Sequence, residues 1–152
     1  MSQLLEDFDA LAADVAYRHT DGLNPASPLT LVTASADMSN FNFERDRLRI
    51  DRDLRLRSYV TWVGTTSLEM RIEASVSAPA GSGSGSGSGA ETEFDLGHAH
   101  FVMVALDKRT QKPRPIHKLQ PTNAREQELW DISERNRQAR KRQVTRFCAC
   151  LH

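Results

Sequence analysis

Residues 54–76 read LRLRSYVTWVGTTSLEMRIEASV, and the alternation of side chains in this stretch decides the fold. Successive residues of a strand point to opposite faces of a sheet. One face of the first half carries Leu54, Leu56, Ser58, Val60 and Trp62, and one face of the second half carries Leu68, Met70, Ile72, Ala74 and Val76. Between them, Gly64-Thr65-Thr66 is typical of a turn. The stretch predicts an antiparallel hairpin with one apolar and one largely polar face.

The segment after this hairpin combines a low-complexity run with another strand. Residues 81–89 alternate strictly between glycine and serine, which predicts a flexible loop over residues 77–93. Such regularity occurs in native insertions and in engineered linkers, and the sequence leaves both open. Residues 98–106 end in FVMVAL, which is apolar on both faces and therefore indicates a strand in the middle of the sheet.

The chain before the hairpin begins with a helical pattern. Apolar positions recur at spacings of three and four, at Leu4, Phe8, Leu11, Ala12, Val15 and His19. Glycine and proline after residue 21 end the pattern. From Leu29 the period changes to two and indicates another strand, which is followed by a polar, irregular stretch over 39–53.

A second helix is expected near the C-terminus, over residues 124–143, with Leu129, Trp130 and Ile132 as its main apolar contacts. Residues 144–152 match no regular element and are expected to be an irregular tail. The order is helix, about four strands, helix. This order predicts one α+β domain over residues 1–123, in which an antiparallel sheet wraps the first helix.

Composition excludes several classes of protein. The chain has 152 residues, which is enough for one domain. No stretch has the ~20 apolar residues of a membrane span, and the first residues do not form a secretory signal. The two cysteines, Cys148 and Cys150, exclude a disulfide scaffold and favour a reducing compartment.

Charge is unevenly distributed although the formal net charge is zero. Residues 135–146 hold six Lys or Arg and no acid, so the other residues, with 14 basic and 20 acidic side chains, carry −6. The basic run matches a solvated helix end. Binding of nucleic acid is not expected, because only Phe147 lies near the run as a stacking aromatic residue.

Four blocks of the sequence resemble, in order, the hotdog acyl-CoA thioesterases. They are residues 4–19 (LLEDFDALAADVAYRH), 32–37 (VTASAD), 60–70 (VTWVGTTSLEM), and 101–105 with 113–115 (FVMVA and PRP). The blocks are similar to the central helix, the strand after it, a hairpin, and the last core strand with its exit. The pattern resembles the eukaryotic mitochondrial acyl-CoA thioesterase 9-like group.

The resemblance implies a hotdog fold, in which an antiparallel sheet wraps a long central helix, and hydrolysis of an acyl-CoA to a free acid and CoA. It implies no cofactor, a homodimer or a second hotdog domain as partner, and a mitochondrial location. The given residues contain no targeting segment in support of that location, and the cytoplasm is the alternative. Family members usually have a strand before the central helix, whereas this helix begins almost at Met1. The chain is therefore interpreted as a single, N-terminally clipped hotdog domain. A catalytically inactive acyl-binding or assembly module is the alternative.

Thioester hydrolysis needs a carboxylate that activates water or attacks the carbonyl carbon. At 100° per residue, Asp9 lies at the rim of the apolar helix face centred on Phe8, beside Leu5 and Ala16. Spacing alone favours an ordinary acid on the flank of a helix. The resemblance implies that Asp9 is the general base or nucleophile, because it occupies the position of the family's catalytic aspartate.

The resemblance also implies that the hairpin turn lies near CoA. The hydroxyl groups of Thr65, Thr66 and Ser67 are therefore candidates for substrate binding, with ordinary turn chemistry as the alternative. Arg55 and Arg57 suit a CoA phosphate or a solvated strand face.

Two further groups of residues are of types that occur in functional sites. His19, on the apolar helix face, suits a hydrogen-bonded core histidine or a base. His98 with His100, and Cys148 with Cys150, are two-ligand fragments that lack the four-ligand spacing of a structural zinc site. No metal is expected.

Overall fold

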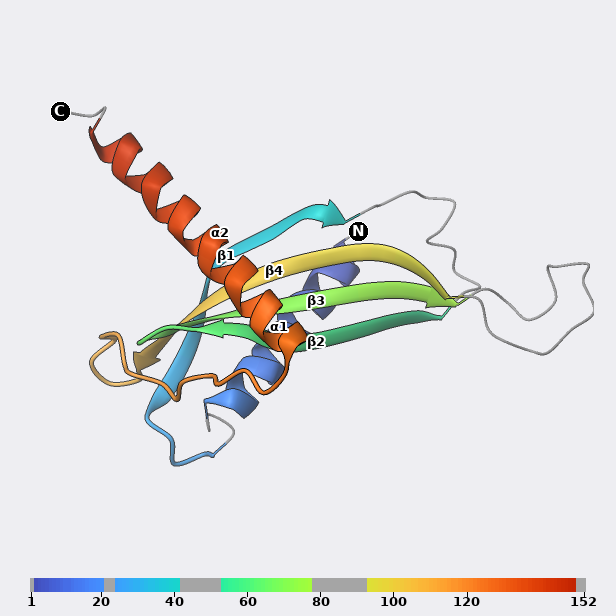
Figure 1. Ribbon diagram of the computed structural model, residues 1–152. Helices are drawn as coiled ribbons and strands as arrows, with labels where there is room; N and C mark the ends of the chain where they lie inside the picture. Colours follow the sequence, from blue (N-terminus) through green and yellow to red (C-terminus); the bar gives the residue numbers. More distant parts are fainter. Residues whose placement is uncertain (1, 21–23, 42–52, 78–92, 150–152) are drawn as a thin grey trace, which may run out of the picture.

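The computed structural model describes residues 2–20, 24–41, 53–77 and 93–149 (Figure 1). The elements are α1 (Ser2–His19), β1 (Leu29–Phe41), β2 (Leu54–Val63), β3 (Ser67–Ser77), β4 (Glu93–Asp107) and α2 (Ala124–Ala149). The glycine–serine run, predicted to be a flexible loop, lies outside the described residues. Within the described residues, neither helix combines the length and the apolar character needed to cross a membrane.

The four strands form one antiparallel sheet in the order β1-β4-β3-β2. The predicted hairpin is confirmed as β2 and β3, and the strand expected in the middle of the sheet is confirmed as β4, which pairs with both β1 and β3. The two helices lie on opposite faces of the sheet (Figure 1). The predicted α+β class, a sheet around a first helix with a further helix at the C-terminus, is therefore confirmed.

The core lies between α1 and the inner face of the sheet. Phe8, Ala12 and Ala16 on α1 are fully buried. They meet the inner residues of β3, which are Leu68, Met70, Ile72, Ala74 and Val76. Phe8 also packs edge-on against Phe41, with 5.4 Å between the ring centroids. Small residues at every fourth position let the helix approach the sheet closely, and the larger strand residues fill the contact.

One predicted face assignment is wrong. Trp62 was placed on the face of Val60, but the pairing register shifts between Val60 and Trp62, so that two residues of β2 occupy one step of the ladder. This bulge turns Trp62 to the outer face, where it meets α2, and places Val63 in the inner core instead. Alternation counted along the sequence cannot register an extra residue inside a strand.

The second helix is longer than predicted. It begins at Ala124 as expected, because the Asn123 side chain accepts a hydrogen bond from the Glu126 backbone N–H at 2.9 Å, and the Glu126 carboxylate accepts one from the Thr122 backbone N–H at 2.7 Å. It ends at Ala149 rather than at residue 143, so residues 144–149 of the expected irregular tail are helical. No glycine or proline interrupts residues 124–149, so the helix continues. Its C-terminal end projects past the sheet (Figure 1).

The contact between α1 and the sheet can be tested by shortening one side chain. We expect Phe8→Ala to lower the free energy of unfolding by about 3–5 kcal/mol, because it leaves a cavity in the core. Leu5→Ala, on the same helix but 45% exposed, should change it by about 0.5 kcal/mol at most. Urea unfolding measures both. Equal losses in the two variants would contradict this view of the core.

Candidate functional site

Asp9 lies exposed on the flank of α1 and contacts the sheet through one hydrogen bond. The hydroxyl group of Thr33, on β1, donates to Asp9 Oδ1 at 3.2 Å. The position of Asp9 follows from the helix register. Phe8 is fully buried, so the next residue, Asp9, must lie on the flank of the helix. Thr33 lies in one of the four resembling blocks, but the sequence does not single it out. The reason is that Thr33 and Asp9 meet only in the folded chain, where α1 crosses β1.

The Asp9–Thr33 pair lies at an open side of the molecule. Among the strands that the structure describes, β1 is at the edge of the sheet and pairs only with β4, and its residues 32–37 are exposed. A second bond holds the helix against this strand, since the Leu31 backbone N–H donates to the Tyr17 hydroxyl at 3.3 Å. The carboxylate and the hydroxyl group of the pair are thus held together and remain accessible to a molecule approaching this edge.

The turn that carries the predicted binding residues Thr65, Thr66 and Ser67 is tied to the end of β4 and the segment after it. The Thr66 carbonyl accepts from the Ala105 N–H at 2.8 Å, and the Thr65 carbonyl accepts from the Ile116 N–H at 3.0 Å. These bonds order the turn. Thr33 pairs with Met103 on β4, and Met103 pairs with Leu68, the residue after the turn. Two strand spacings, about 10 Å, therefore separate the partner of Asp9 from the end of the turn.

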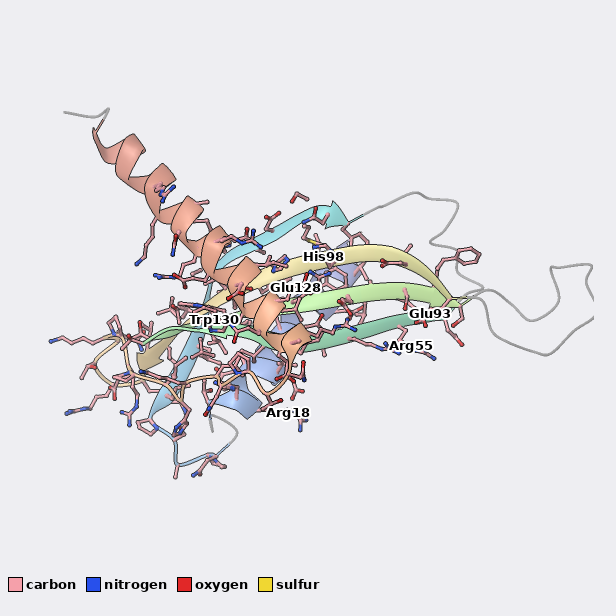
Figure 2. The ribbon with its side chains drawn as sticks, in the orientation of Figure 1. Arg18, Arg55, Glu93, His98, Glu128 and Trp130 are labelled. Atoms are coloured by element: carbon pink, nitrogen blue, oxygen red, sulfur yellow. The ribbon has the colours of Figure 1, made fainter. Side chains whose placement is uncertain are left out.

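Of the other predicted residues, His19 is partly buried, and its Nε2 lies 3.0 Å from the carbonyl oxygen of His117. It is ten residues from Asp9, or ~15 Å along the helix, so it holds the later segment against α1 and is not beside the carboxylate. Arg55 is exposed and pairs with Glu93 at 3.3 Å near the end of the sheet (Figure 2). Arg57 is exposed opposite Glu73.

His98 and His100 lie on the outer face of β4 with their ring centroids 5.2 Å apart. Burial and the charge of Arg71 lower the pKa of His98. No group of three or more potential metal ligands is found among the described residues. Cys148 falls in the last turns of α2, and Cys150 lies outside the described residues.

A buried carboxylate that the sequence did not reveal lies under α2. The Glu69 side chain, on β3, is only 1% exposed, and its two oxygens contact His100 Nδ1 at 3.2 Å and Arg140 Nη2 at 2.5 Å. Burial alone would raise the pKa of Glu69. Hydrogen bonds from His100 and Arg140 outweigh it, so this pKa lies below its usual value. The alternation of β3 placed Glu69 on the polar face, and only the helix covering that face makes it buried.

Further polar contacts lie between α2 and the sheet. The Ser133 hydroxyl donates to the Thr61 hydroxyl at 2.9 Å, and both residues are buried. The Arg137 guanidinium lies over the Trp62 ring, 4.9 Å from its centroid. Arg137 also bonds Glu134, and this contact holds the pKa of Glu134 at about 2. Specific polar pairs therefore help to hold the helix on the sheet.

The sequence is similar to one segment of several acyl-CoA thioesterases. It is 34% identical over 143 residues to acyl-coenzyme A thioesterase 2, chloroplastic, of Humulus lupulus, covering 93% of this chain and 30% of the relative. It is 30% identical over 139 residues to the mitochondrial acyl-coenzyme A thioesterase 9 of Mus musculus, covering 91% of this chain and 29% of the relative. The chain thus spans about a third of the length of the curated relatives it matches. No protein-family model matches it.

The sequence thus resembles one segment of the acyl-CoA thioesterases.

Solved structures agree with this relationship at the level of fold. The acyl-CoA hydrolase of Bacillus cereus superposes with a TM-score of 0.70 at 22% identity, covering 99% of this chain and 82% of that one. A hexameric acyl-CoA thioesterase superposes with a TM-score of 0.71 at 23% identity, covering 94% of this chain and 79% of that one. The predicted resemblance to hotdog acyl-CoA thioesterases, and the predicted hotdog fold, are both confirmed.

The buried Glu69 predicts a pH-dependent stability. Because its pKa is lower in the folded chain than in the unfolded chain, its ionised contacts stabilise the fold above about pH 4.3 and are lost as the pH falls further. We expect Glu69→Gln to lower the free energy of unfolding by about 1–3 kcal/mol at neutral pH, with a smaller loss in acid. Urea unfolding across pH measures this. Glu128→Gln, an exposed change on α2, is the control and should cost little at any pH. A Glu69→Gln loss that does not vary with pH would contradict the assignment.

Proposed function

We propose that this chain is the hotdog domain of an acyl-CoA thioesterase and that Asp9 carries the reaction. The single observation behind the proposal is the Asp9–Thr33 pair, a carboxylate held by a hydroxyl group at an open edge of a fold that acyl-CoA hydrolases share. Solved structures of the Staphylococcus aureus acyl-CoA hydrolase include variants in which a single aspartate, asparagine or threonine is replaced by alanine. An aspartate and a threonine are the two residue types that meet here.

In the proposed reaction Asp9 acts as a general base. It takes a proton from a water molecule, whose oxygen attacks the carbonyl carbon of the thioester. The tetrahedral intermediate then expels the CoA thiolate, the carbon–sulfur bond breaks, and the proton on Asp9 passes to the sulfur. The products are the free acid and CoA. Thr33 keeps the carboxylate in one orientation through the reaction by donating to Oδ1. Direct attack by Asp9 is the other form of the same role.

A second hotdog domain, from a homodimer or from the rest of a longer chain, completes the site in this proposal. Asp9 and Thr33 are both exposed, whereas hydrolysis favours a site from which bulk water is excluded. Strand β1 is an open edge suited to pairing with another strand, and Val32 on it is 42% exposed. One solved relative is a hexamer, and the sequence relatives are more than three times the aligned length.

The hydroxyl groups of Thr65, Thr66 and Ser67 bind the substrate in this proposal. The turn is ordered by its bonds to residues 105 and 116, and Thr65 is exposed. The relatives carry mitochondrial or chloroplastic names, and we propose a mitochondrial location for the protein that contains this chain. A catalytically inactive module would share the fold and lack turnover, so activity separates the two functions.

Replacement of the carboxylate tests the proposal directly. We expect Asp9→Asn to lower kcat for acyl-CoA hydrolysis by at least about 100-fold, because the amide cannot accept the proton. Thr33→Val should lower kcat less, by about tenfold, because it removes only the orienting bond. CoA release from acyl-CoAs of increasing chain length measures both.

Asp14→Asn is the matched control, because Asp14 is a second carboxylate of α1, and it pairs with Arg18 on the helix surface. It should keep wild-type turnover. Equal turnover in Asp9→Asn and wild type would refute the role of Asp9, and a folded wild-type chain without turnover would favour the inactive module.

The open edge of β1 predicts how copies of the chain associate. We expect Val32→Lys to shift the chain toward a monomer, because a charge on the edge disfavours strand pairing. Leu54→Lys, an exposed apolar residue on the opposite edge strand β2, should leave association unchanged. Light scattering after size-exclusion chromatography gives the mass of each variant. Dissociation by Leu54→Lys alone would move the interface to β2.

A further inference from the structure

A second concentration of positive charge, distinct from the basic run of α2, lies just after β4. Residues 107–118, DKRTQKPRPIHK, hold five Lys or Arg and one acid, and we call them the basic corner. Lys108, Arg109, Lys112 and Lys118 are exposed. Such a surplus of cations on one short segment favours a polyanionic ligand.

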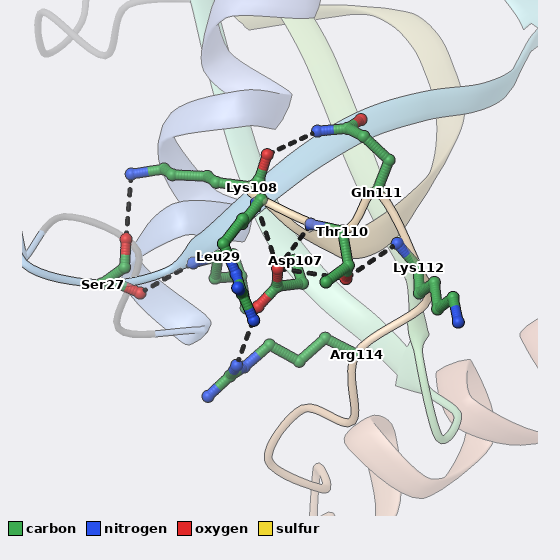
Figure 3. Close-up of polar contacts among 9 residues, drawn as sticks. Ser27, Leu29, Asp107, Lys108, Thr110, Gln111, Lys112 and Arg114 are labelled. Atoms are coloured by element: carbon green, nitrogen blue, oxygen red, sulfur yellow. Dashed lines mark hydrogen bonds and ion pairs between the residues drawn. The ribbon is translucent and has the colours of Figure 1, made fainter.

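The basic corner is held in a fixed shape by its one acid (Figure 3). Asp107 Oδ1 accepts hydrogen bonds from the backbone N–H groups of Arg109 and Thr110, at 3.0 and 2.8 Å, and from the Thr110 hydroxyl at 3.1 Å. The backbone closes on itself, since the Asp107 N–H donates to the Lys112 carbonyl at 2.9 Å and the Gln111 N–H donates to the Asp107 carbonyl at 2.8 Å. The bonds from Thr110 and Arg109 to Oδ1 lower the pKa of the Asp107 carboxyl group, and both sets of bonds leave the corner preorganised.

A cavity of about 540 Å³ opens beside the corner. It is lined by Arg114, Pro115, Ile116 and His117 on one side and by Thr20, Asn24 and residues 26–29 on the other. Among the described residues that line it there is no carboxylate. Lys108 lies at its rim, because its Nζ donates to the Ser27 carbonyl at 2.9 Å (Figure 3). That acceptor is neutral, so this contact leaves the charge of Lys108 uncancelled.

A second cavity with arginines in its wall is less suited to an anion. It has a volume of about 400 Å³ and lies between α2 and the sheet, beside Ser67, Arg137 and Arg140. Arg140 is bound to the buried Glu69, and Arg137 is bound to Glu134 at 2.7 Å. Arg114 has a looser partner, since its bond to Asp107 is 3.4 Å long and its side chain is 44% exposed. An incoming phosphate therefore meets less competition at the basic corner.

The corner also lies at a useful distance from Asp9. Thr20, in the cavity wall, is eleven residues further along α1, or ~16 Å at the rise of a helix. The pantetheine arm between the sulfur and the diphosphate of CoA is as long as about four extended residues, roughly 14 Å. Ile116, also in the wall, bonds the turn at Thr65. A CoA with its sulfur near Asp9 can thus place its phosphates at this cavity.

We propose that the basic corner binds the phosphate groups of CoA, with Arg114 and Lys108 as the main contacts and His117 beside them. The inference rests on the proposed thioesterase function and adds the subsite that holds the charged end of the substrate. The arginine fork offers paired N–H donors to phosphate oxygens, and the lysine adds a point charge.

The test compares binding of CoA and of pantetheine, which lacks the phosphates, by calorimetry on the whole chain. We expect the double variant Lys108→Gln/Arg114→Gln to weaken CoA binding at least about tenfold, and the dependence of Kd on salt to become shallower. Pantetheine binding should not change. The control, Arg135→Gln/Arg142→Gln, removes the same charge from exposed positions on α2 and should weaken CoA less than twofold.

A charge-retaining variant, Lys108→Arg/Arg114→Lys, guards against loss of folding and should keep most of the affinity. In turnover, the neutralised corner should raise KM for acyl-CoA with little change in kcat. Unchanged CoA affinity in Lys108→Gln/Arg114→Gln, or an equal loss in the α2 control, would overturn the subsite and leave the thioesterase proposal standing. A wild-type chain that binds CoA through the corner but does not hydrolyse acyl-CoA overturns the proposed reaction alone, and one that does not bind CoA overturns both.

Discussion

The burial of one face of α1 against the inner face of β3 is the contact on which the rest of the structure depends. Phe8 and five alternating residues of β3 are buried together, and each large apolar side chain removed from water contributes about 1.5–3 kcal/mol. Strand β3 shares this face with β4, which joins β1 to the sheet. Because Phe8 must point inward, its neighbour Asp9 lies at the rim of the contact. The position of the candidate carboxylate is thus a consequence of packing.

On the outer face of the sheet, polar and charged contacts take part in the packing of α2. The alternate positions of this face on β3 are charged, so α2 cannot cover them with apolar side chains alone. The helix instead supplies a side chain of opposite charge, Arg140, which with His100 of β4 stabilises the buried Glu69. Breaking one member of such a cluster leaves a buried charge without compensation, which makes the docking of α2 specific. The bulge at Thr61 serves the same interface, since it turns Trp62 outward to meet Arg137.

Local periodicity explains what the sequence could predict. The β2–β3 hairpin and the central place of β4 follow from alternation and from a strand that is apolar on both faces, and both are properties of consecutive residues. The face of Trp62, the burial of Glu69 and the length of α2 depend on a bulge, a covering helix and the absence of a stop signal. For the site, helix register and family resemblance together pointed to Asp9. Its partner Thr33 is 24 residues away, and no local pattern links two residues that meet only where α1 crosses the edge strand.

Negative charge lies near the start of α1 and positive charge lies beside its end. This separation favours one orientation of the proposed substrate along the helix. Glu6, Asp7 and Asp9 are exposed near the start of the helix, while the basic corner lies beside its end. The two regions are ~16 Å apart along the helix, further than the ~8 Å Debye length at physiological salt, so each acts largely on its own neighbourhood. Phosphates of CoA are repelled at the first region and attracted at the second, whereas the uncharged thioester is tolerated beside Asp9. The reactive and the charged ends of one long substrate therefore have opposite electrostatic preferences along a single helix, and only one orientation satisfies both.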